Sequence, residues 1–175
     1  MRYFELFAIP VDYNIDLATI NKNYLELQRA VHPDRHASSS SRDKLLAVQN
    51  AAEINDALQT LKHPVKRAEY MLSELGVDIR AEQQTLQDPL FLMQQMELRE
   101  ELEELENAAD PDAAIAQFEA QIKQLDKQYS SELAAQLASN DEQQWQAAAD
   151  NIRKLKFVYK LRDELERIED SLFDD

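Results

Sequence analysis

Glycine is the residue type that most constrains this chain, because only Gly76 occurs among 175 residues, together with five prolines. The tight turns of β-sheets rely on glycine and proline, so a chain this poor in both cannot make the many turns of a sandwich or a barrel. Apolar residues instead recur three and four positions apart over long stretches, which is the spacing of helices with one buried face. The sequence therefore predicts an all-α protein.

The charge of the chain is strongly acidic and unevenly distributed. Thirty-four acidic residues against nineteen basic ones give a formal net charge of −15, so nucleic acids and anionic membrane surfaces would be repelled. Residues 1–76 carry a net charge of −1, whereas residues 77–175 carry −14. This shift predicts two domains, 1–76 and 85–175, joined by a linker over residues 77–84.

Absent residue types and segments narrow the function further. The chain has no cysteine, which excludes disulfides, thiolate metal sites and a cysteine nucleophile. Its longest apolar runs span only a few residues, and Glu5 stands where a signal peptide would carry its apolar segment. We expect a soluble cytoplasmic protein that uses no metal and no cofactor.

Three helices are expected before Gly76. Asp16 is a good N-cap for the first, which must end near Val31 because Pro33 disfavours helical backbone before it. A second helix follows the serines at 38–41 and ends at Pro64, so the two form an antiparallel hairpin with a loop at its tip. A third helix covers 65–75, with Gly76 in the left-handed conformation after it. The stripes of the first two helices are Leu17, Ile20, Tyr24, Leu27 and Val31, and Leu45, Val48, Ala51, Ala52, Ile54, Leu58 and Leu61.

The second half of the chain predicts an antiparallel three-helix bundle. Asp110 and Pro111 combine an N-cap with a proline at the first helical position, and Ser139 and Glu142 have the spacing of a capping box. Three amphipathic helices with short connections favour a bundle. The expected inward positions are Phe91, Leu98, Leu102 and Leu105; Ile115, Phe118, Ile122, Leu125, Tyr129, Leu133 and Leu137; and Trp145, Ala148, Ile152, Leu155, Val158, Leu161, Leu165, Ile168 and Leu172.

Four segments of the first half together resemble the J-domain family of co-chaperones in order and spacing. They are Tyr3-Phe4-Glu5-Leu6-Phe7, His32-Pro33-Asp34, Ile54-Asn55-Asp56-Ala57-Leu58 and His63-Pro64-Val65-Lys66-Arg67-Ala68-Glu69-Tyr70. A J-like part joined to an acidic three-helix bundle resembles the HscB subfamily, which serves iron–sulfur cluster assembly. Segments 91–102 and 153–157 resemble that subfamily too, so the resemblance spans nearly the whole chain.

Two positions depart from the J-domain pattern. Val31 stands where an aromatic residue often precedes His-Pro-Asp, and Ala8 stands where many J-domains have glycine. Neither change alters a group to which we assign chemistry. The cysteine-rich extension of some mitochondrial relatives is absent, which favours a bacterial-type protein without zinc.

The resemblance implies that His32, Pro33 and Asp34 engage a DnaK-type chaperone, for this subfamily HscA, and stimulate its ATPase. Proline restrains the backbone, so less entropy is lost on docking, and Asp34 could accept a bond from a partner arginine. Lys22, Arg29 and Arg35 could form a basic patch toward an acidic partner surface. The alternatives are that Pro33 only ends a helix and that the basic residues are ordinary solvated charges.

A second candidate surface follows from the helical wheel of residues 91–105. Three apolar side chains, Leu92, Met93 and Met96, lie opposite the inward stripe. Exposed apolar groups ringed by carboxylates suit a partner site with a polar rim. The resemblance implies that this surface binds the scaffold protein IscU, through Leu92, Met93, Met96, Glu97, Glu100, Glu104 and Phe157. Alternatively, Leu92 and Met93 pack against the J-like part.

These observations predict a co-chaperone rather than an enzyme, one that delivers IscU to HscA. A J-protein that delivers another client is the nearest alternative, because the His-Pro-Asp loop specifies the ATPase class more firmly than the bundle specifies its cargo. An enzyme that uses His32 and Asp34, or a metal site at His32 and His36, is a weaker one, because Pro33 breaks the helix that would align the two rings.

Overall fold

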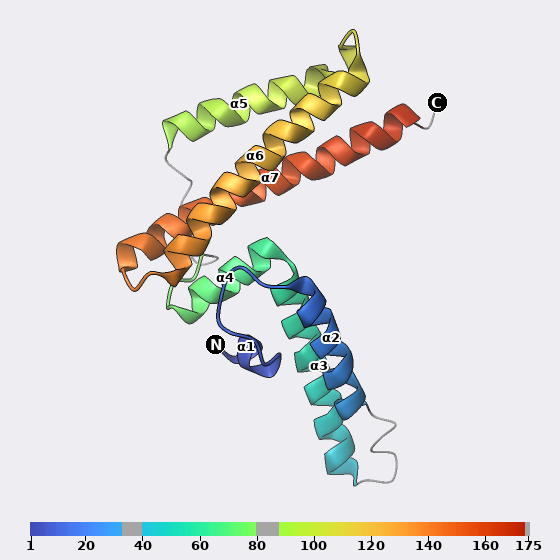
Figure 1. The fold of residues 1–175 in the computed structure, drawn as a ribbon, viewed down its shortest axis with the longest axis vertical. Coiled ribbons are helices and arrows are strands. Elements are labelled where there is room, and N and C mark those ends of the chain that lie inside the picture. The colour runs from blue at the N-terminus through green and yellow to red at the C-terminus, as the bar shows by residue number, and fades with distance from the viewer. Residues whose placement is uncertain (33–39, 80–87, 174–175) are drawn as a thin grey trace.

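The computed structural model describes residues 1–32, 40–79 and 88–173, and every regular element within these ranges is a helix. Figure 1 shows two arms, a hairpin of α2 and α3 and a bundle of α5, α6 and α7, which meet at α4. The predicted all-α hairpin and antiparallel bundle are confirmed. The elements are α1 (Arg2–Leu6), α2 (Leu17–Val31), α3 (Ser41–Lys62), α4 (Pro64–Glu74), α5 (Pro89–Glu104), the 3₁₀ turn η2 (Leu105–Asn107), α6 (Pro111–Ala138) and α7 (Glu142–Phe173).

Most helix starts follow from local capping chemistry. The Asp16 carboxylate accepts a hydrogen bond from the Ala18 N–H at 3.1 Å, as expected of an N-cap. Asp110 likewise accepts from the Ala113 N–H at 3.2 Å, with Pro111 at the first helical position. Both predicted starts are confirmed.

The start of α7 differs from the prediction. The helix begins at Glu142, and it is Asp141, not Ser139, whose carboxylate accepts a hydrogen bond from a first-turn amide, the Gln143 N–H at 3.0 Å. The Ser139 hydroxyl accepts instead from the Asp141 N–H at 3.1 Å, outside the helix. The predicted capping box is therefore wrong. Asp141 directly precedes the helix and caps its first turn in place of Ser139.

Gly76 ends α4 in the way its lack of a side chain allows. Its φ is +95°, and its N–H donates to the Ser73 carbonyl at 2.9 Å while the Val77 N–H donates to the Leu72 carbonyl at 3.0 Å. These two bonds form a Schellman motif, which requires a left-handed residue at this position. The predicted left-handed glycine is confirmed; the helix itself ends one residue earlier than expected, at Glu74.

The hairpin buries less of its apolar surface than the sequence stripe suggested. Leu17, Leu45 and Val48 are about half exposed, at 48%, 58% and 53%, although they belong to the apolar stripes that predicted the two helices. Leu45 and Val48 lie near the start of α3, which in Figure 1 extends away from α4 and the bundle, whereas Leu17 begins α2 at the end of the hairpin nearer α4. Nearer α4 the stripe is buried as predicted at Ile54, Leu58 and Leu61.

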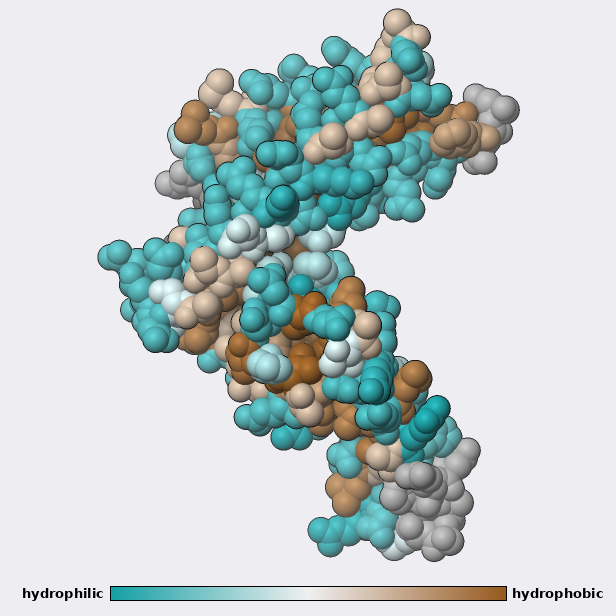
Figure 2. Space-filling view, viewed as in Figure 1, coloured by the Kyte–Doolittle hydropathy of each residue, from teal (hydrophilic) through white to brown (hydrophobic). Residues whose placement is uncertain are grey.

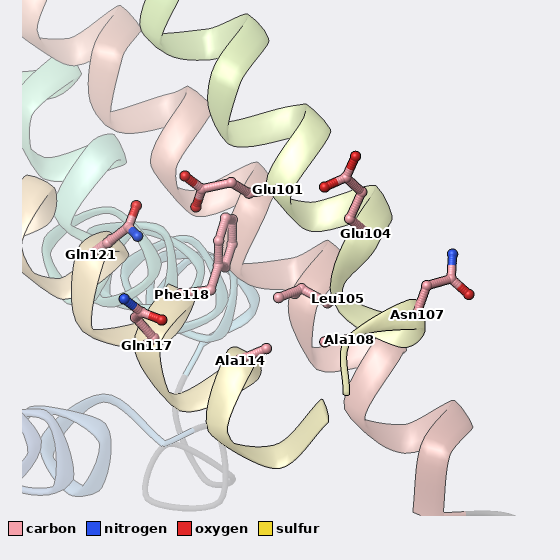
Figure 3. Close-up of a pocket in the computed structure, with 9 residues that line it drawn as sticks. All are labelled: Glu101, Glu104, Leu105, Asn107, Ala108, Ala114, Gln117, Phe118 and Gln121. Carbon is pink, nitrogen blue, oxygen red and sulfur yellow. The ribbon is translucent and has the colours of Figure 1, made fainter. Parts of the chain in front are cut away.

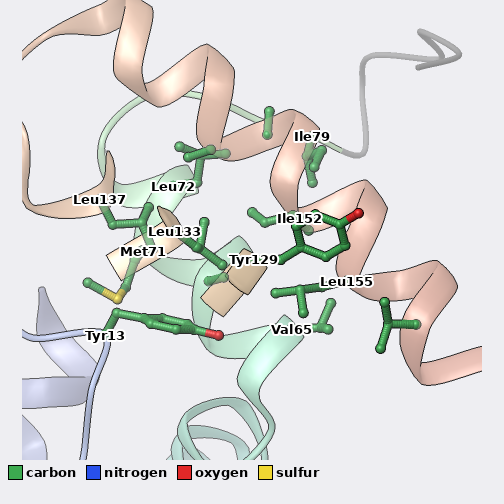
Figure 4. Close-up of a cluster of buried hydrophobic side chains, with 14 of the residues drawn as sticks. Tyr13, Val65, Met71, Leu72, Ile79, Tyr129, Leu133, Leu137, Ile152 and Leu155 are labelled. Atoms are coloured by element: carbon green, nitrogen blue, oxygen red, sulfur yellow. The ribbon is translucent and has the colours of Figure 1, made fainter. Parts of the chain in front are cut away.

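The two arms share one hydrophobic core where α4 packs against α6 and α7. Figure 4 shows Met71 and Leu72 of α4 facing Leu133 of α6 and Ile152 of α7, and all four are buried. Val77 and Ile79, at the start of the predicted linker, are also buried in this cluster. Residues 80–84 of that linker lie outside the described residues.

Polar contacts reinforce the same junction. The buried Arg67 guanidinium donates to the Leu61 carbonyl at 2.7 Å and lies 4.8 Å from the centre of the Tyr13 ring. Burial lowers the pKa of Arg67 and raises the pKa of Tyr13. Between the arms, Lys156 of α7 pairs with Glu69 of α4 at 3.2 Å. The junction is thus apolar at its centre and paired by charge at its edge.

The first prediction concerns Gly76. An added Cβ would meet nothing within 4 Å, so the cost of Gly76→Ala is that of the left-handed backbone alone. We expect the free energy of unfolding to fall by about 1 kcal/mol for Gly76→Ala and by less for Gly76→Asn, since asparagine tolerates this conformation better. Urea unfolding followed by circular dichroism measures both, and an alanine variant as stable as the parent would contradict the capping role.

Candidate functional site

Helix α2 and the residue after it carry part of the predicted chaperone-binding set, here called the hairpin surface and defined by Lys22, Arg29 and His32. All three side chains are exposed, and His32 directly follows the last turn of α2. Figure 1 shows this end of α2 pointing away from the bundle. The positive charge of Arg29 suits the C-terminal end of a helix dipole. The other predicted members, Pro33, Asp34 and Arg35, lie outside the described residues, as does His36.

The outward face of α5 forms a second exposed surface, the α5 patch. Its apolar members Leu92, Met93 and Met96 are 52%, 59% and 63% exposed. Three exposed carboxylates follow along the same helix, at Glu97, Glu100 and Glu104. Because Leu92 and Met93 are exposed, the alternative that they pack against the N-terminal part is wrong. Figure 2 shows brown side chains at the N-terminal end of α5 on an arm that is otherwise mostly teal.

Leu90 is an apolar neighbour of the patch that the sequence reasoning missed. It is 79% exposed, more than any of the three predicted apolar members. Its exposure could have been predicted from the sequence, because Leu90 lies outside the inward stripe that begins at Phe91.

The inward face of α5 is what holds this patch in place. Phe91, Leu98 and Leu102 are buried as predicted, and the Phe91 ring meets the Tyr129 ring of α6 edge-on, with centroids 6.3 Å apart. The Tyr129 hydroxyl donates to Oε1 of Gln94 at 3.3 Å, and burial raises the Tyr129 pKa. Because these side chains pack inward, Leu92, Met93 and Met96 on the opposite face of α5 stay more than half exposed.

The first turn of α5 is fixed by Asp88. Its carboxylate accepts from the Phe91 N–H at 3.2 Å and pairs with Nζ of Lys154 at 3.3 Å. The Phe91 hydrogen bond, followed by the Lys154 contact, lowers the Asp88 pKa. This N-cap fixes where α5 begins and therefore where Leu90 and Leu92 lie on the helix.

Phe157, the last predicted scaffold-binding residue, lies at the contact between α5 and α7. Its ring is partly buried, meets the Phe91 ring edge-on with centroids 5.8 Å apart, and has the Arg99 guanidinium 5.7 Å from its centre. Arg99 also reaches Glu164 of α7, at 3.2 Å. Phe157 therefore packs against the inward side of α5 at Phe91, while part of its ring stays accessible to solvent.

Within the described ranges, none of the helices is both long enough and apolar enough to cross a membrane. In those same ranges, no three histidine or carboxylate side chains gather closely enough to hold a metal ion.

Two family models match the chain. The DnaJ domain model matches residues 2–70, and a model described as the HSCB C-terminal oligomerisation domain matches residues 87–166. Together they cover the J-like part and the bundle.

Several known proteins similar to this chain are named as HscB co-chaperones. The co-chaperone protein HscB homolog of Photobacterium profundum is 54% identical over 99% of this chain and 100% of its own length. The corresponding Vibrio cholerae protein is 52% identical over 98% of this chain and 99% of its own length. The solved structure of chaperone HscB from Vibrio cholerae matches with a TM-score of 0.87 at 52% identity, covering 97% of this chain and 99% of that one. Human co-chaperone HscB matches with a TM-score of 0.82 at 25% identity, covering 95% of this chain and 81% of that one.

The second prediction separates the α5 patch from the core. Leu92→Ala and Met93→Ala should each change the free energy of unfolding by less than about 0.5 kcal/mol, because exposed side chains contribute little to the fold. Leu98→Ala, on the same helix but 5% exposed, should cost about 2–5 kcal/mol. Urea unfolding of the three variants measures these changes. A large decrease in the free energy of unfolding for Leu92→Ala or Met93→Ala would mean that these side chains belong to the core.

Proposed function

Since the chain belongs to the HscB family of J-domain co-chaperones, we propose that it binds the scaffold protein IscU through the α5 patch and delivers it to the DnaK-type chaperone HscA. It then stimulates ATP hydrolysis by HscA during iron–sulfur cluster assembly in the cytoplasm. In this proposal residues 1–76 form the J-domain, 77–84 the linker and 85–175 the client-binding bundle.

The observation that carries the proposal is the exposure of the α5 patch. Leu92, Met93 and Met96 contribute apolar surface that the monomer does not bury, and carboxylates border it along the helix. An apolar centre with a polar rim is the usual composition of a protein-binding surface. Methionine side chains adapt to the shape of a partner, which suits recognition of a folded client.

The hairpin surface supports the second half of the proposal. Lys22 and Arg29 are seven residues apart, close to two helical turns, so they lie on the same side of α2, and His32 follows at its end. Positive side chains on an otherwise acidic chain favour an acidic docking face. We assign Pro33, Asp34 and Arg35 to the same contact on the strength of the motif alone.

The two surfaces lie on different arms, so both partners could be held at once (Figure 1). A client bound to the α5 patch would then reach the chaperone at a high effective concentration, set by the tether rather than by free diffusion. The co-chaperone itself would hydrolyse no ATP and carry no cluster. Its contribution would be binding and positioning.

The third prediction tests the hairpin. Asp34→Asn removes the negative charge proposed to accept a bond from the chaperone and should abolish stimulation of HscA ATPase. The same variant should bind IscU as the parent does, because the α5 patch is on the other arm. Steady-state ATPase assays and calorimetric titration measure the two effects, and undiminished stimulation by Asp34→Asn would refute the assigned contact.

The fourth prediction tests the α5 patch. Leu92→Ala and Met93→Ala should each weaken IscU binding about fivefold or more, since an apolar side chain fully buried by a partner contributes about 1.5–3 kcal/mol. A single Glu97→Ala or Glu100→Ala should cost about 0.2–1 kcal/mol, the usual range for an exposed ion pair.

Calorimetric titration of IscU measures these affinities, with Leu46→Ala as the matched control. Leu46 is 46% exposed, similar to Leu92, but lies on α3 of the other arm. Equal affinities of the parent and both apolar variants would remove the patch from the proposal. Strong binding of unfolded clients without binding of IscU would favour a J-protein that serves a different cargo.

A further inference from the structure

A groove runs along the seam between α5 and α6. It consists of three hollows of about 600, 460 and 490 Å³, here called together the α5–α6 groove. The first two hollows share Gln117 and Gln121, and the second and third share Gln94. The groove therefore passes from the turn at η2 toward the N-terminal end of α5.

The end of the groove at η2 has an apolar floor between polar walls. Figure 3 shows Phe118 and Leu105 lying between Glu101 and Glu104 of α5 on one side and Gln117 and Gln121 of α6 on the other. Phe118 is only 1% exposed and Leu105 5%, so the floor belongs to the core. The groove stays open because Ala114 and Ala120 stand on its α6 side, where larger side chains would fill it.

The walls offer groups that suit a polypeptide backbone. A glutamine carboxamide both donates and accepts hydrogen bonds, as a peptide group does. Within the described part of the chain, the carboxamides of Gln117 and Gln121 make no side-chain hydrogen bond. They are thus available to a backbone lying along the apolar floor.

The charge of the groove is mainly negative: Lys154 lines the third hollow, where it pairs with Asp88 at 3.3 Å, but the end at η2 carries carboxylates without such a partner. Glu101 and Glu104 have no cationic side chain at ion-pair distance among the described residues, and Lys123 of α6 pairs instead with Glu119, at 3.7 Å. Opposite charge favours association and like charge opposes it. An occupant with lysine or arginine therefore fits, whereas a second copy of this chain would bring a bundle half with a net charge of −14.

We propose that the α5–α6 groove binds an extended segment of the client that bears lysine or arginine, as a continuation of the site at the α5 patch. The inference rests on the proposed function, because the groove opens directly from that patch: Leu90 and Met93 line its third hollow. The apolar patch would hold the folded body of the client. The groove would hold the segment, through backbone hydrogen bonds and pairing with Glu101 and Glu104.

A charge reversal tests the groove at a carboxylate that is not part of the α5 patch. Glu101→Lys should weaken IscU binding about threefold or more at low salt and less at high salt, because screening reduces the contribution of exposed charges. The matched control is Glu103→Lys, which changes net charge equally at an exposed position that lines none of the three hollows. Circular dichroism checks that both variants are folded, and affinities are measured by calorimetric titration.

A site-specific cross-linker identifies the occupant. A photo-reactive amino acid at position 117 should cross-link to an IscU peptide containing lysine or arginine, identified by mass spectrometry. The same group at exposed Ala116, which lines none of the hollows, should cross-link weakly or not at all.

The outcomes separate this inference from the proposed function. If the parent protein does not bind IscU, the proposed function fails and the groove loses its assigned occupant. If the parent binds and Met93→Ala weakens binding, but Glu101→Lys and Glu103→Lys behave alike and position 117 does not cross-link, only the groove is refuted. Cross-links from position 117 to a second copy of the chain would overturn the client assignment in favour of self-association.

Discussion

Packing of α4 against α6 and α7 joins the hairpin to the bundle and fixes where each arm presents its surface. Each buried side chain at this contact, such as Leu72 or Leu133, stabilises the fold by about 1.5–3 kcal/mol relative to an exposed one. Arg67 adds a guanidinium that is bonded to the Leu61 carbonyl and covered by Tyr13, and Lys156 pairs with Glu69 across the edge. The two parts of the chain that match separate family models, residues 2–70 and 87–166, therefore contribute to one continuous hydrophobic core.

With the junction formed, each arm keeps one face that the core does not use. Helix α5 buries Phe91, Leu98 and Leu102 in the core and leaves Leu92, Met93 and Met96 exposed. Folding and the proposed binding therefore use different side chains. The hairpin leaves Lys22 and Arg29 exposed in the same way. A substitution in either surface can therefore change binding without unfolding the protein, which makes the two proposed contacts separately testable.

Features set by local chemistry were predictable from the sequence. Asp16, Asp110 and Gly76 cap helices through bonds to residues at most five positions away, so short segments contain the whole signal. Short α1 was missed because five residues show no helical period, although it buries Phe4. The exposure of Leu45 and Val48 depends on how far other elements reach along α3, which no local pattern encodes. The α5–α6 groove likewise arises from the spacing of two helices, together with the small residues Ala114 and Ala120 on its α6 side.

The α5 patch could be predicted because a helical wheel contains its whole signal, whereas the interpretation of Phe157 needed the packing of α7 against α5. The His-Pro-Asp segment was found by its resemblance to a family, and of its three residues only His32 lies in the described part of the chain. The central claim is that one molecule holds the client and the chaperone at the same time. The most direct test is the HscA ATPase rate with this protein alone, with IscU alone and with both together. Simultaneous binding predicts that both together raise the rate by more than the product of their separate effects. Separate effects that simply multiply, or a lower rate in the presence of both, would contradict it.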